Sequence, residues 1–174
     1  MISEWSDQER QIVRAKVRVA QVIYIATCAS IAIYLIVGYA IAMANHPFSG
    51  FGPVGQGGSI IAILRYVLWA IALGTALPFV LVVRWIVWKQ ATASGTLLAP
   101  DQYGDFFLKY SIITSAVSEA PAVYGLALFL LAGSWLDLIG LCVLATVYKS
   151  LFIPTVGKVM EWAQQMESDI QSRG

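Results

Sequence analysis

Charged residues are scarce in this sequence, and their scarcity excludes several classes of protein. Charged residues make up 12% of the 174 residues, against about a quarter in an ordinary soluble domain. Hydrophobic residues reach 59%, and the mean hydropathy is +0.73. These values exclude a water-exposed globule, a disordered chain and a nucleic-acid-binding protein. We therefore interpret the chain as a membrane protein.

Histidine and cysteine are also rare. His46 is the only histidine, which excludes bis-histidine haem, di-iron carboxylate–histidine clusters and histidine-based catalytic triads. Cys28 and Cys142 both lie in apolar stretches and are expected to be buried thiols, not a redox pair. No metal site and no cofactor is expected, and no nucleophile–base pair or phosphate-binding loop points to an enzyme.

Long uncharged or nearly uncharged runs are present instead. A hydrocarbon core about 30 Å thick requires roughly 20 apolar helical residues. Four runs meet this requirement, at about residues 19–44, 60–88, 107–133 and 136–156. We expect an all-α polytopic membrane protein with four transmembrane helices in an antiparallel bundle. The short connection Gly133-Ser134 predicts a tight hairpin between the third and fourth helices.

The chain is expected to divide into a membrane domain, residues 1–156, and a tail helix, residues 157–174. Apolar residues of the tail recur at three- and four-residue steps: Val159, Ala163, Met166 and Ile170. This spacing predicts an amphipathic cytoplasmic C-terminal helix.

The basic residues predict the orientation. With an even number of crossings and a cytoplasmic N-terminus, all of the eleven Lys and Arg residues except Arg65 lie in or toward the cytoplasm. The sequence therefore predicts an integral protein of the cytoplasmic (inner) membrane with both termini cytoplasmic. Arg65, close to the outer end of its helix, is expected to anchor at lipid headgroups or to pair with Asp137.

A basic stripe precedes the first crossing. Arg10, Arg14 and Arg18 repeat every four residues, so they share one face of a helix. Such a face attracts anionic lipid headgroups at about 1 kcal/mol per charge, and it could equally bind an acidic partner.

Glu119 is the deepest charge in the predicted membrane domain. Lys149 is at a similar depth, because each of the two residues is fifteen positions from Ser134 in the hairpin. Two alternatives follow. An ion pair with Lys149 would keep Glu119 ionised and structural, whereas a lysine that extends to the interface would leave a buried carboxyl that binds a proton reversibly.

The residues around Glu119 resemble a known family. The stretch from Ser118 to Leu126 has Glu-Ala, three residues, then Tyr-Gly-Leu, which resembles the carboxylate helix of the rotary ATP synthase proteolipid, the c subunit. The residues that match in register are Glu119, Ala120, Tyr124, Gly125 and Leu126. The resemblance implies that Glu119 carries an ion and that Tyr124 is a neighbour within its site.

Three functions are consistent with the sequence. The first is a non-enzymatic integral-membrane subunit or interaction protein of an energy-transducing complex, with membrane-protein partners or further copies of itself in the bilayer. The alternative is a proton-translocating, proteolipid-like protein in which Glu119 is assisted by four side chains: Ser118, Tyr124, Thr114 and Lys149. A membrane enzyme acting on a lipid or quinone is the third, although the chain lacks the clustered His, Asp or Cys that such chemistry uses.

Overall fold

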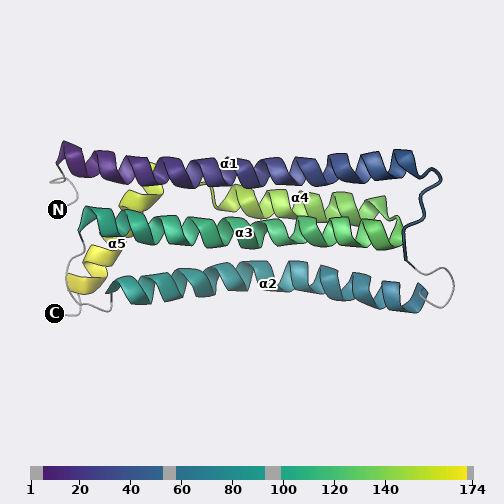
Figure 1. Ribbon diagram of the computed structural model, residues 1–174. Coiled ribbons are helices and arrows are strands. Elements are labelled where there is room, and N and C mark those ends of the chain that lie inside the picture. Colours follow the sequence, from purple (N-terminus) through teal and green to yellow (C-terminus); the bar gives the residue numbers. More distant parts are fainter. Residues whose placement is uncertain (1–5, 53–57, 93–98, 172–174) are drawn as a thin grey trace. The chain divides into compact units, whose positions relative to one another are not determined.

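The computed structural model describes residues 6–52, 58–92 and 99–171. These residues form helices joined by short connections, and they contain no strand, which confirms the predicted all-α class. The elements in chain order (Figure 1) are α1, Asp7–Ala44; α2, Gly58–Thr92; α3, Pro100–Ala132; α4, Trp135–Leu151; and α5, Val156–Gln171.

Two of these helices are long and apolar enough to cross a membrane: α1 and the Asp101–Ala132 part of α3. A third span arises if α4 and the Val156–Met166 part of α5, which are bent by 59° at their junction, cross as one broken span. The 17 residues of α4 alone extend about 26 Å, less than a hydrocarbon core of about 30 Å. In α2, whose side chains at residues 75–80 lie outside the described residues, the described apolar stretch Ile60–Gly74 is by itself shorter than a span. Among the residues that the structure describes, two helices, or three with the bent pair, are thus long and apolar enough to cross a membrane, and four spans are not confirmed.

The chain forms two compact units. Helices α1, α2 and α3 each contribute a segment to both. Unit 1 consists of Met1–Ile25, Val80–Ser115 and Phe152–Gly174, and unit 2 of Ala26–Phe79 and Ala116–Leu151.

Unit 1 has an aromatic core centred on Trp162 of α5. The rings nearest to it are those of Tyr110, Phe107 and Trp88, with centroids 4.8, 5.9 and 6.4 Å away. Within α5, the expected apolar face is buried: Val159, Ala163 and Met166 are each at most 1% exposed. The side chain of Ile170, the fourth residue of that face, lies outside the described residues.

Unit 2 contains the predicted hairpin of α3 and α4. Gly133 adopts a φ of +65°, and its N–H donates to the carbonyl of Phe129 at 2.7 Å, which ends α3. The hydroxyl of Ser134 accepts from the N–H of Asp137 at 3.4 Å and caps α4. Farther along the hairpin, α3 and α4 approach each other closely at Gly125. A Cβ atom added to this residue would lie only 3.2 Å from the Cα of Leu138.

We expect the variant Gly133→Ala to lower the free energy of unfolding by about 2–3 kcal/mol. The left-handed conformation disfavours a side chain, and the added Cβ would lie 2.7 Å from the backbone of Ser49, which cannot rotate away. Detergent-induced unfolding followed by circular dichroism measures this loss. Gly74→Ala is the matched control, because nothing lies within 4 Å of its added methyl group. Equal stability of the two variants would contradict this account of the hairpin.

Candidate functional site

Unit 2 holds two carboxyl groups in different chemical surroundings. Asp137 lies in the first turn of α4 and is 5% exposed. Glu119 lies in α3 and is half-buried. The partners of each carboxyl determine which protonation states it can adopt.

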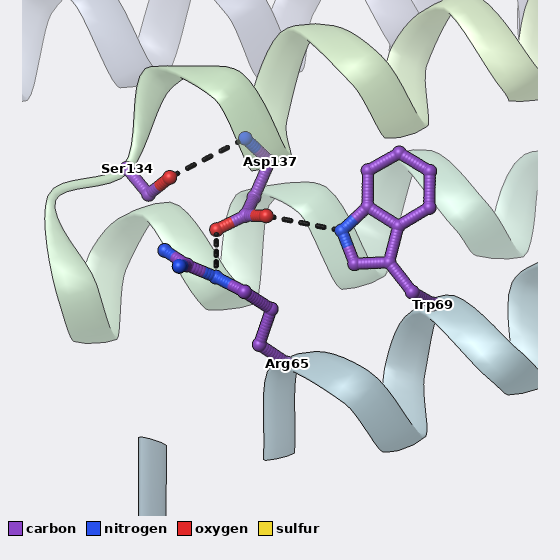
Figure 2. Close-up of polar contacts among 4 residues, drawn as sticks. All are labelled: Arg65, Trp69, Ser134 and Asp137. Atoms are coloured by element: carbon purple, nitrogen blue, oxygen red, sulfur yellow. Dashed lines mark hydrogen bonds and ion pairs between the residues drawn. The ribbon is translucent and has the colours of Figure 1, made fainter. Parts of the chain in front are cut away.

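Asp137 accepts hydrogen bonds from two side chains of α2. Figure 2 shows Arg65 and Trp69, one turn apart, both pointing toward it. The Nε of Arg65 donates to Oδ2 at 2.8 Å, and the Nε1 of Trp69 donates to Oδ1 at 3.0 Å. The structure therefore contains the ion pair that was one of the two expected roles of Arg65.

These surroundings hold Asp137 in its ionised form. Arginine and tryptophan side chains only donate hydrogen bonds, so neither could accept one from a protonated carboxyl. The N-terminus of α4 adds the favourable end of a helix dipole. We conclude that Asp137 is a structural anion that joins α4 to α2.

Glu119 has hydroxyl partners instead. Its Oε1 accepts hydrogen bonds from the hydroxyl of Ser30 and, at 2.7 Å, from the hydroxyl of Tyr34. Ser30 and Tyr34 are four residues apart on α1, so they lie on the same face of that helix. The hydroxyl of Ser30 is also 2.8 Å from the carbonyl oxygen of Thr27. This small network joins α1 to α3.

Lys149 of α4 belongs to the same region of unit 2. Its side chain is 2% exposed, so Lys149 is buried in the unit that also holds Glu119. The region thus combines one acid, two hydroxyls and one base.

The other side chains expected at this site have different surroundings. Ser118 is buried beside Glu119 in α3, but Tyr124 packs against the cluster of Ala72, Leu128 and Leu141. Thr114 belongs to unit 1, where its hydroxyl donates to the carbonyls of Tyr110 at 2.8 Å and Ser111 at 3.2 Å.

Ser30 and Tyr34 were not among the residues predicted for the site. A signal was present in the sequence: Thr27, Ser30 and Tyr34 follow one another at three- and four-residue steps within an apolar run. This spacing gives a stripe of hydroxyls along one helix face. The partner of that stripe could not be predicted, because spacing within one helix does not determine how it faces another.

The basic stripe of α1 lies in unit 1. Arg14 and Arg18 are exposed and, with Gln11 and Ala15, line a pocket of about 430 Å³. Lys16, off the stripe, forms an ion pair with Asp105 at 2.7 Å. Arg10 is half-buried, so two of the three predicted cations are exposed.

Within the described ranges, no group of three or more His, Cys, Asp or Glu side chains could hold a metal ion. Comparisons with protein-family models, curated proteins and solved structures find no match to this chain.

Proposed function

We propose that this chain is a non-enzymatic integral-membrane protein in which Glu119 binds and releases a proton, and that it acts as a subunit of an energy-transducing membrane complex. One observation carries the proposal. Glu119 is held by the hydroxyls of Ser30 and Tyr34, which both donate and accept hydrogen bonds, whereas Asp137 is held by groups that only donate.

The hydroxyls allow Glu119 to be satisfied in either protonation state. When it is ionised, Ser30 and Tyr34 both donate to it. When it is protonated, its O–H can donate to Ser30, whose own proton then turns to the carbonyl of Thr27. In both states Ser30 and Tyr34 keep a hydrogen bond to the carboxyl group of Glu119, so no large structural change need accompany proton exchange.

Lys149 supplies the counterbalance. In this proposal the buried Lys149, in the same unit, acts as the counter-charge of ionised Glu119. The local resemblance of the stretch from Ser118 to Leu126 to the proteolipid carboxylate helix points to the same carboxyl.

The proposal includes four crossings of the cytoplasmic (inner) membrane, with both termini cytoplasmic. Support comes from the long apolar helices α1 and α3, from the apolar residues of α2 and the bent α4–α5 pair, and from the distribution of Lys and Arg. Lipids surround the exposed apolar faces, and other membrane proteins or further copies of the chain are the proposed partners.

A second candidate function is assembly alone, without proton exchange. The burial of Lys149 in the same unit as Glu119 favours it, because a permanent pair between them would make this carboxylate a structural link like Asp137. The protein would then serve its complex only through helix contacts.

Labelling with a hydrophobic carbodiimide distinguishes the two functions, because this reagent modifies protonated carboxyls in apolar surroundings. We expect mass spectrometry to find the adduct on Glu119, in decreasing yield as pH rises, and none in Glu119→Gln. Asp137 is the internal control and is expected to stay unmodified. A natively folded protein that shows no adduct on Glu119 across the neutral pH range would favour assembly alone.

A further inference from the structure

A polar pocket opens on the exposed face of α1 in unit 1. It has a volume of about 430 Å³, and its lining residues are Gln11, Arg14, Ala15 and Arg18. All four are exposed, and all belong to the Met1–Ile25 segment of unit 1. Glu119 belongs to unit 2, so binding at this pocket does not depend on the proposed proton exchange.

The packing of α1 determines which side of the helix carries the pocket. Val13 and Val17 are at most 2% exposed and belong to the core of unit 1. Arg14 and Arg18 each follow one of these valines by a single position, which is a rotation of about 100° around the helix. The core contacts of the valines thus keep both arginines outside the core of unit 1.

The described lining of the pocket carries two positive charges and no Asp or Glu. Among the described residues, neither Arg14 nor Arg18 takes part in an ion pair, a hydrogen bond or a cation–π contact. The first acid on the same helix face is Asp7, which is about 10 Å along the axis from Arg14. The charge of the two guanidiniums is therefore available to an anion.

The same face of α1 becomes apolar directly after Arg18. Val22 and Ile25 follow at steps of four and three residues, and they are 65% and 64% exposed. They belong to the uncharged run that begins at Val19, in a helix long and apolar enough to cross a membrane. The face therefore changes from guanidinium to aliphatic side chains within about 6 Å along the axis.

We propose that this face of α1 binds one anionic phospholipid whose headgroup carries no ammonium group. The guanidiniums of Arg14 and Arg18 bind oxygens of its phosphate, because a guanidinium matches two such oxygens. One acyl chain lies along Val22 and Ile25. A free phosphate or an acidic protein segment would use the charges and leave this apolar continuation uncovered.

The two guanidiniums also select the headgroup. The ammonium of a zwitterionic headgroup is repelled by Arg14 and Arg18, and the described lining offers no carboxylate to offset this repulsion. An anionic headgroup keeps its net negative charge. Arg10 is not part of this site, because it is half-buried and has an interaction of its own.

The first test is lipid binding to delipidated full-length protein in an uncharged detergent, measured by native mass spectrometry. The probes are phosphatidylglycerol and phosphatidylcholine with identical acyl chains. We expect phosphatidylglycerol to bind about tenfold more tightly, from the attraction of two basic residues. Equal affinities, or a higher affinity for phosphatidylcholine, would overturn the proposal.

Variants assign the preference to this pocket. The double variant Arg14→Gln with Arg18→Gln is expected to bind both lipids equally, and each single variant to lose about fivefold in affinity for phosphatidylglycerol. Lys89→Gln with Lys109→Gln is the matched control, because it removes two exposed cations of unit 1 outside the pocket. A preference kept by the folded arginine variant, or lost equally in the lysine control, would contradict the assignment and favour an acidic protein partner for the arginines.

Inorganic phosphate distinguishes a lipid site from a site for the anion alone. In excess over bound phosphatidylglycerol, it should displace no more lipid than ammonium acetate of the same ionic strength does, because it has no acyl chain to replace the contacts with Val22 and Ile25. Greater displacement by phosphate would show that the charges alone determine binding, and would overturn the lipid assignment.

Discussion

Replacing Arg65 with glutamine is expected to lower the free energy of unfolding by about 2–3 kcal/mol. The variant leaves the carboxylate of Asp137, which is 5% exposed, without its counter-charge. Removing one partner of a fully buried pair costs about 3–5 kcal/mol. The expected loss is smaller here because the Arg65 side chain is 41% exposed and Trp69 still donates to Asp137.

A double-mutant cycle isolates the pair. The double variant, Arg65→Gln with Asp137→Asn, should lose less stability than the sum of the losses in the two single variants. Each single variant leaves one charge of the pair without its partner, whereas the double variant has no charge at either position. Detergent-induced unfolding provides the free energies. Arg14→Gln, which removes an exposed arginine of unit 1, is the control for charge loss. Additive effects within about 0.5 kcal/mol would show that Arg65 and Asp137 are not coupled.

The double variant Ser30→Ala with Tyr34→Phe is expected to destabilise the protein by about 2–3 kcal/mol and to increase carbodiimide labelling of Glu119 at a fixed pH. Both hydroxyls donate to the same oxygen, Oε1. Without them the ionised carboxylate loses its donors, and the protonated form is favoured instead. Unfolding curves and adduct yield measure the two effects.

Tyr39→Phe is the matched control for the loss of a phenolic hydroxyl, because Tyr39 is on the same helix and 60% exposed. Each single variant should lose part of the stability, since the other hydroxyl still donates. If the double variant kept the wild-type stability and adduct yield, the hydroxyls could not be the groups that support Glu119.

Local features of the fold could be predicted because short-range rules determine them. The hairpin followed from Gly133 and Ser134, which allow only a tight connection, and the buried face of α5 followed from the spacing of Val159, Ala163 and Met166. The division into two units could not be predicted. It depends on side-chain contacts between segments remote in the sequence, such as Val13 and Trp162 in one core.

The candidate site was predictable to a similar extent. Glu119 was identifiable because a charge in an apolar run requires a partner. Its hydroxyl partners depend on how α1 is rotated against α3, and a helical period does not specify that rotation. For the same reason, the sequence did not distinguish Trp69, which donates a hydrogen bond to Asp137, from an aromatic residue that faces the lipid.

The most direct test of the central claim is infrared difference spectroscopy of the protonated-carboxyl C=O stretch, recorded as pH changes in reconstituted protein. We predict a band that appears reversibly on acidification, is retained in Asp137→Asn and is absent from Glu119→Gln. A band that persists in Glu119→Gln, or no titrating band in the wild-type protein, would contradict proton exchange at Glu119.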